Sequence, residues 1–110
     1  MRIWDLETKF LCNQHLLGEH RELHAIWSIL TKNKKGYSKH PETLRWRGKL
    51  KALFNRHKAE VKEMKNRGFK HFSDLNFKLA SGSSIQKNFL NSAEEQKKIL
   101  KNKFCRCLLQ

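Results

Sequence analysis

The stretch that decides the fold is QHLLGEHRELHAIWSIL, residues 14–30 of the 110-residue chain. Apolar residues recur in it at helical spacing, which is typical of a helix that packs against a core. The residues on this apolar stripe are Leu16, Leu23, Trp27 and Leu30. The sequence therefore predicts a helix over about residues 13–30, with Asn13 as its N-cap.

A second line on the same helix carries titratable groups. His15, Glu19 and Glu22 follow one another at i, i+4 and i+7, and the line continues as Ile26 and Ile29. The carboxylates have two interpretations. They are surface and capping charges that the helix dipole favours, or they are partly withdrawn from water and form a functional site.

The rest of the chain predicts two further helices. Pro41 suits the first turn of the second, an apolar stripe runs from Leu50 to Met64, and Gly68 suits its C-cap. A capping box at Ser92–Glu95 predicts the third, which continues to about Lys103. Residues 2–12 suit a short helix or turn that holds the amino terminus, and residues 31–40 and 69–84 read as loops. The predicted fold is all-α, a single compact domain over residues 1–110 with three main helices and connecting loops.

The net charge of the chain indicates the chemical class of its binding partner. Twenty-four Lys and Arg against ten Asp and Glu give a net charge of +14, which favours a polyanion, nucleic acid first. No apolar run of membrane-spanning length and no secretory leader occurs, so we expect no membrane partner. An odd number of cysteines (Cys12, Cys105 and Cys107) argues against a disulfide framework and suits a reducing cytoplasm.

Two basic stretches are candidates for DNA binding. One is the loop with Lys34 and Lys35, and the other is the start of the second helix with Arg45, Trp46, Arg47 and Lys49. Trp46 has two interpretations that the sequence leaves open, a ring that stacks on bases or wedges into a duplex, and a partly buried anchor.

A metal site is a weaker hypothesis. His20 and His24 are spaced i, i+4 and lie close to Glu19, but Arg21 breaks the H-E-x-x-H order and a cation there opposes metal binding. His57, on the stripe of the second helix, reads as a core-edge histidine satisfied by a neighbour. We therefore predict no metal and no cofactor.

Short matches along the first 70 residues carry a resemblance. They are Met1-Arg2-Ile3, Leu11, Gln14-His15-Leu16, Glu19 and Arg21-Glu22-Leu23, which align without a gap, followed by Lys49-Leu50 and Arg67-Gly68-Phe69. In these residues the chain resembles the pyrimidine-dimer DNA glycosylases of the phage endonuclease V type, over roughly residues 1–70. Residues 71–110 do not take part in the resemblance.

The resemblance implies a DNA repair glycosylase with AP-lyase activity that acts on double-stranded DNA. Its nucleophile would be the amine of Met1, and Glu22 the second catalytic group. Further contacts to DNA would come from Arg2, Gln14, His15 and Arg21. The phage prototype exposes a threonine after loss of its initiator methionine, whereas here the bulky Arg2 is expected to keep Met1 in place.

We expect a monomer that attacks pyrimidine dimers or a related base lesion. The alternative is a basic helical protein that binds nucleic acid without catalysis. It would explain the charge and the helices, and it would leave the match at the amino terminus without a reason.

Overall fold

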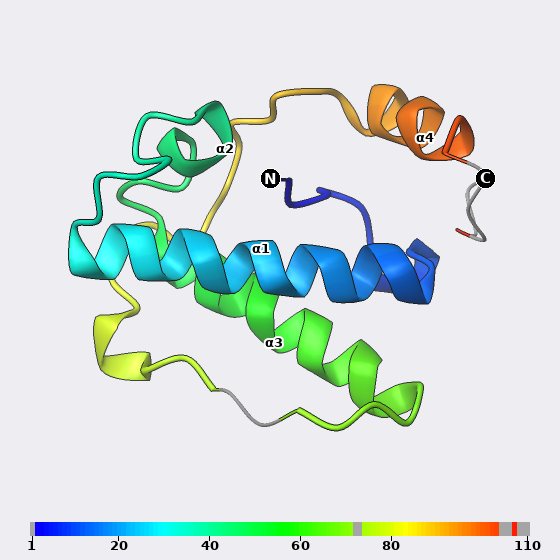
Figure 1. The fold of residues 1–110 in the computed structure, drawn as a ribbon, viewed down its shortest axis with the longest axis horizontal. Helices are drawn as coiled ribbons and strands as arrows, with labels where there is room; N and C mark the ends of the chain where they lie inside the picture. Colours follow the sequence, from blue (N-terminus) through cyan, green and yellow to red (C-terminus); the bar gives the residue numbers. More distant parts are fainter. Residues whose placement is uncertain (1, 72–73, 104–106, 108–110) are drawn as a thin grey trace.

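The two longest helices, α1 (Asn13–Lys32) and α3 (Leu50–Asn66), pack against each other at the centre of the fold (Figure 1). The structure is a computed structural model that describes residues 2–71, 74–103 and 107. Its shorter elements are η1 (Thr8–Phe10), α2 (Pro41–Leu44), η2 (Phe77–Leu79) and α4 (Ala93–Lys101). No β-strand occurs within the described residues. The prediction of an all-α fold with three main helices is confirmed.

Helix α1 covers the predicted range and adds two residues at its end. Asn33 ends it in the left-handed conformation, with φ of 51°, and its N–H donates to the carbonyl of Ile29. The predicted N-cap is wrong by one residue, because Asn13 is already helical and Cys12 takes the cap position. The Asn13 side chain instead accepts a hydrogen bond of 3.0 Å from Arg67 at the end of α3.

The predicted second helix is two helices, because a turn over residues 45–49 separates α2 from α3. Gly48 adopts φ of +73°, which ends the helical path. A later segment crosses at this point, where the Ser83 N–H donates to the Gly48 carbonyl over 2.9 Å. A Cβ at Gly82 would lie 2.1 Å from the same carbonyl oxygen, so only glycine permits this close approach.

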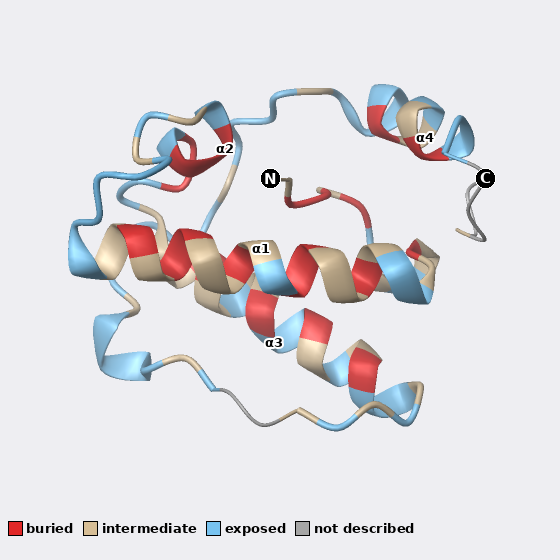
Figure 2. Ribbon diagram, viewed as in Figure 1, coloured by how far each residue is buried: buried red, intermediate tan, exposed pale blue. Residues whose placement is uncertain are grey.

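The core consists of two apolar clusters that meet at the amino-terminal segment, residues 2–6. Figure 2 shows buried residues along that segment and along α1 and α3. Ile3 belongs to the first cluster and Trp4 to the second. The first cluster is Ile3, Leu23, Ile26, Trp27, Trp46, Ala52 and Leu53, and the second is Trp4, Leu6, Leu11, Leu16, Met64 and Leu100. Two consecutive residues therefore fix the start of the chain in both halves of the core.

Helix α4 closes the fold on the other side of the amino-terminal segment from α1 (Figure 1). Its predicted capping box is present, since Ser92 and Glu95 each accept a hydrogen bond from the other's backbone N–H. Leu100 is fully buried in the second cluster. No helix among the described residues has the length and apolar content that crossing a bilayer requires.

Candidate functional site

The amino-terminal segment is held by hydrogen bonds from three directions. The backbone N–H of Trp4 donates to Glu19 Oε1 of α1 over 2.7 Å, and Arg45 Nη2 donates to the Ile3 carbonyl over 2.9 Å. The N–H of Asp5 donates to Gln96 of α4, also over 2.7 Å. The predicted nucleophile, Met1, lies outside the described residues. The residues that follow it are fixed beside α1.

Glu19 belongs to the interior. It is 2% exposed and receives two hydrogen bonds from Arg56 of α3, of 2.8 and 2.9 Å, besides the bond from Trp4. Burial raises the pKa of Glu19, and the nearby Arg56 guanidinium opposes that shift. Glu19 is therefore a buried structural residue that anchors the amino-terminal segment to α1.

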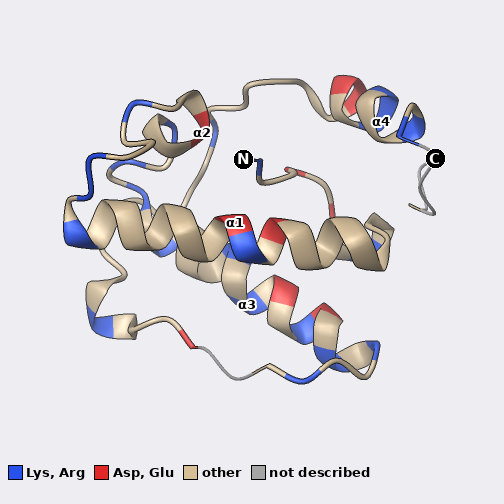
Figure 3. Ribbon diagram, viewed as in Figure 1, with Lys and Arg blue, Asp and Glu red and all other residues tan. Residues whose placement is uncertain are grey.

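Glu22 lies one turn further along α1 and is half-buried, next to the exposed Arg21. Figure 3 shows the acidic residues of α1 at the middle of the helix, beside the amino-terminal segment, with basic residues both next to them and at the carboxyl end of the helix. Gly18 lies one turn before Glu22, and a Cβ on it would be 3.9 Å from the Arg21 guanidinium. The two carboxylates on this face of α1 therefore differ in environment. Glu19 is buried, and Glu22 is accessible.

Arg2 belongs to the amino-terminal segment, and Gln14 and His15 lie in the first turn of α1. Arg2 donates to the Asn91 side chain over 2.8 Å, and its guanidinium stacks 4.8 Å from the centre of the Trp4 ring. Gln14 is exposed. His15 is half-buried, and burial lowers its pKa, with a further contribution from Lys103. Its Nδ1 lies 3.1 Å from the sulfur of Cys12.

The expected surface positions of Arg45 and Trp46 are wrong. Each is 3% exposed, because the turn after α2 directs both side chains into the protein. Arg45 pairs with Glu42 and with Asp5 (3.0 Å), and the Trp46 indole donates to Glu42 over 3.1 Å. For Trp46 the anchor interpretation is the correct one. Both side chains are withdrawn from the protein surface, and Arg45 holds the amino-terminal segment through the Ile3 carbonyl.

We predict that Arg45→Ala destabilises the protein by about 3–5 kcal/mol, because it leaves the buried carboxylates of Asp5 and Glu42 without their cation. Arg47→Ala is the matched control, since Arg47 is exposed two residues away and its loss is expected to change stability by less than about 0.5 kcal/mol. Urea unfolding of both variants measures the difference. Equal stabilities would contradict the anchoring role of Arg45.

Three of the predicted DNA-binding residues surround one pocket at the carboxyl end of α1. This basic pocket has a volume of about 450 Å³ and is lined by Lys34, Lys35 and Arg47, with Ile29 and Leu50 among the apolar residues. Lys49 is half-buried nearby and donates to Gln86 over 2.7 Å. Cations at this position also complement the negative end of the helix dipole.

We predict that Arg47→Ala weakens DNA binding to a similar degree for all sequences and lowers the slope of log affinity against log salt by about 1. Lys101→Ala is the control, because Lys101 is equally exposed and lies on α4, away from the basic pocket. Binding titrations at several salt concentrations measure both slopes. An unchanged slope for Arg47→Ala would remove the basic pocket from the DNA-binding surface.

The structure also brings four histidines together. His20 and His24 of α1 meet His57 of α3 and His71, which follows α3, and their ligand nitrogens lie within 4.8 Å of one another. A second group joins Cys12 and His15 to Cys107. The spacing of His20 and His24 was visible in the sequence, but Glu19 turns to Arg56 and does not join them. The neighbour predicted for His57 is His24, at 3.3 Å.

The domain is all-α, carries a net charge of +14, and holds its amino-terminal segment beside the acidic residues of α1. A family model described as pyrimidine dimer DNA glycosylase matches residues 1–76. The chain therefore belongs to the pyrimidine dimer DNA glycosylase family, whose substrate is DNA. No curated protein and no solved structure gives a significant match.

Proposed function

We propose that this protein is a DNA glycosylase with AP-lyase activity, which removes pyrimidine dimers or a related lesion through the amine of Met1 and the carboxylate of Glu22. Membership of the family supports glycosylase action on DNA. The family description does not include the amine nucleophile or the lyase step, and both are part of the proposal. The observation that carries them is the fixed position of residues 2–6 beside α1.

The direction of the amino-terminal segment supports the choice of Glu22 as the catalytic carboxylate. The Trp4 nitrogen is bound to Glu19, and the three residues back to the Met1 nitrogen span at most about 11 Å. The segment runs antiparallel to α1 (Figure 1), so stepping back from Trp4 leads along α1 in the direction from Glu19 to Glu22. Glu22 is about 4.5 Å further along the helix axis than Glu19. The direction of residues 2–4 along α1 therefore supports the proposed use of Glu22 with the leading amine.

A leading amine suits this chemistry better than a lysine. With a reference pKa of about 7.7–8.0, roughly a third of α-amines are neutral near pH 7.4, against about a thousandth of lysine side chains. Only the neutral amine attacks carbon. Its attack on C1′ of the deoxyribose expels the damaged base, which leaves with a proton, and ring opening gives an imine to the sugar.

Glu22 supplies the acid and base steps. Its carboxylate would stabilise the positive charge that develops on the sugar and the iminium, and it would carry protons during ring opening. Loss of a proton from C2′ then expels the 3′ phosphate by β-elimination and breaks the strand. Water finally hydrolyses the imine and restores the free amine.

The surroundings suit a DNA strand with one nucleotide turned out of the duplex. Arg21 and Arg2 supply cations near the middle of α1, and the basic pocket supplies Lys34, Lys35 and Arg47. Extrusion of a nucleotide costs a few kcal/mol, least where a lesion already weakens pairing. This favours damaged sites. With Trp46 buried, the aromatic ring that remains exposed in the basic loop is Tyr37, at 70%.

The test is incubation of the full-length chain with duplexes that carry one cyclobutane pyrimidine dimer, one abasic site or no lesion. We expect cleavage at the dimer and at the abasic site, and none in the undamaged duplex. The rival function, binding without catalysis, rests on the net charge of +14. It predicts retention of all three duplexes without a break in any of them, and that result would overturn the proposal.

A further inference from the structure

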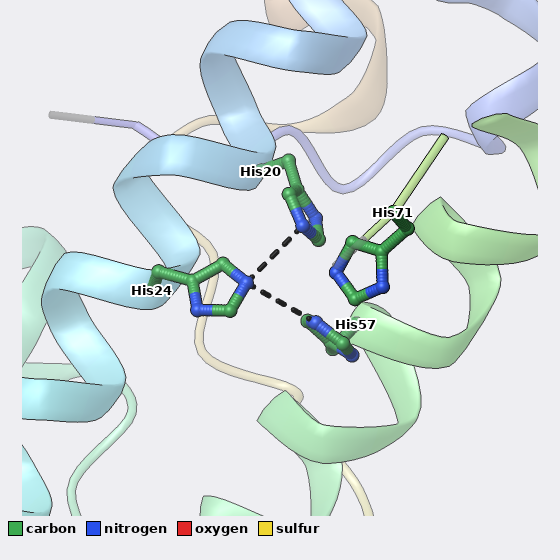
Figure 4. A group of neighbouring side chains, drawn as sticks. All are labelled: His20, His24, His57 and His71. Carbon is green, nitrogen blue, oxygen red and sulfur yellow. Dashed lines mark hydrogen bonds between the residues drawn. The ribbon is translucent and has the colours of Figure 1, made fainter. Parts of the chain in front are cut away.

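Four of the six histidines of the chain form one cluster from three separate segments (Figure 4). His20 and His24 lie one turn apart on α1, so both rings face α3. His57 reaches them from α3, and His71 from the segment after it. The ring centres of His20, His57 and His71 lie 4.9 to 5.1 Å from one another. We call this group the histidine cluster.

The ring nitrogens of the cluster face one another. His24 Nε2 lies 3.1 Å from His20 Nε2 and 3.3 Å from His57 Nε2. A neutral imidazole carries one N–H, so a proton on His24 Nε2 satisfies one of these two contacts and leaves the other to the remaining rings. The nitrogens of the cluster could therefore share one metal ion as their common partner.

Carboxylates outside the cluster set the tautomers. Glu60 Oε1 lies 2.9 Å from His20 Nδ1, so the proton of that ring sits on Nδ1 and the Nε2 lone pair points into the cluster. The exposed Asp74 carboxylate makes a longer contact of 3.4 Å with His71 Nδ1. His71 Nε2 is buried and has no hydrogen-bond partner among the described residues. A carboxylate behind the far nitrogen is the arrangement typical of metal-binding histidines.

Two of the spacings between these nitrogens are close to those around a tetrahedral ion. Zinc–nitrogen bonds of 2.0–2.1 Å place two ligands of a tetrahedron roughly 3.3–3.4 Å apart. The contacts of 3.1 and 3.3 Å are close to that edge. Burial lowers the pKa of all four imidazoles, that of His57 to about 4.

We propose that His20, His24, His57 and His71 bind one zinc ion that joins α1 to α3 and to the segment after α3. Imidazole ligands suit zinc, and four of them complete a tetrahedron without an open position, which is typical of a structural site. A pocket of about 520 Å³, lined by His57 and Asp74, offers a route from solvent. The site is independent of the proposed glycosylase chemistry, to which it adds rigidity in α1.

The test uses the untagged full-length chain, because a polyhistidine tag would itself bind metal. Protein purified from zinc-supplemented medium is passed through gel filtration, and its metal content is measured by mass spectrometry. We expect about one zinc per chain. Zinc added to chelator-treated protein at about one hundred times its Kd should raise the Tm by roughly 10 °C. Cobalt in place of zinc should give the visible absorption of a tetrahedral site without a thiolate charge-transfer band.

Two variants locate the ion. His71→Ala removes a ligand outside the helices and should reduce bound zinc at least tenfold while keeping the helical circular dichroism, and His57→Gln should do the same from α3. His40→Asn is the matched control, since His40 lies outside the cluster and caps α2 through its Nδ1, and the asparagine side-chain oxygen can accept the same hydrogen bond from the Glu42 N–H. This variant should retain the zinc and the shift in Tm.

The second group of possible ligands gives the decisive alternative. Cys12→Ser should leave zinc binding unchanged if the histidine cluster holds the ion, and loss of zinc in Cys12→Ser with retention in His71→Ala would overturn the proposal. A wild-type chain that binds no zinc would overturn it as well, and so would a preference for another metal at the same four histidines. None of these results depends on DNA cleavage.

Discussion

Glu22→Gln is expected to lower the rate of strand cleavage by about 10²- to 10⁴-fold while binding to damaged DNA is unchanged. Glutamine keeps the size and the hydrogen-bonding reach of the side chain but neither stabilises a cation by charge nor carries protons. Glu22 is half-buried and next to Arg21, so the substitution leaves no buried charge without its partner. The fold should therefore survive, and the loss should appear in the chemical step.

The measurement is single-turnover cleavage of a duplex with one abasic site, alongside a binding titration. Glu94→Gln is the matched control, because Glu94 is an exposed acid in the first turn of α4 and should cleave at the wild-type rate. Cleavage by Glu22→Gln at the wild-type rate would refute the role of Glu22. Loss of binding together with cleavage would show a contact to DNA in place of an acid–base group.

The second large effect concerns the start of the chain. Adding Gly-Ser before Met1 moves the leading amine by roughly 7 Å while residues 2–6 stay bound to Glu19, Arg45 and Gln96. Because a displacement of about 1 Å can cost 10²-fold in rate, we expect cleavage to fall by at least about 10²-fold.

The same two residues added after Gln110 are the control for the length and composition of the extension. This variant should cleave DNA at the wild-type rate. Circular dichroism and DNA binding should be equal in the two extended proteins. If the chain extended before Met1 cleaved as fast as the control, the nucleophile would have to be another group of the protein.

Local patterns predicted the helices because their causes lie within a few residues. The stripe of α1 and the capping box of α4 are set by spacing along the chain, and both are present. The break between α2 and α3 depends on a distant segment, since Gly48 is held in its turn by Ser83, thirty-five residues later. The apolar stripe begins at Leu50, after the break, and so carried no information about that crossing.

The candidate site divides in the same way. The match at the amino terminus indicated Glu22 and the family, and both rest on short motifs. Arg45 looked like a DNA-binding cation because lysine and arginine surround it, but its partner Asp5 lies forty residues earlier and directs it inward. When a sequence contains many arginines, it does not by itself show which of them is buried.

The sequence indicated two of the four residues of the histidine cluster. His20 and His24 share a helical face, and this spacing is a known signature of metal ligands. His57 and His71 join them only when α3 packs on α1 and the chain turns back after it. The sequence argument against a metal ion at these histidines was the positive charge of Arg21. In the structure, Arg21 is exposed on another side of α1. Tertiary contacts thus complete a ligand set that no linear motif describes.

The most direct test is to trap the covalent intermediate. Borohydride added during reaction with abasic DNA reduces an imine to a stable amine, and digestion followed by mass spectrometry locates the sugar remnant on the protein. The remnant is predicted on the α-nitrogen of Met1. A remnant on a lysine side chain, such as Lys34 or Lys35 of the basic pocket, or cleavage of the strand with no trapped species at all, would contradict the account.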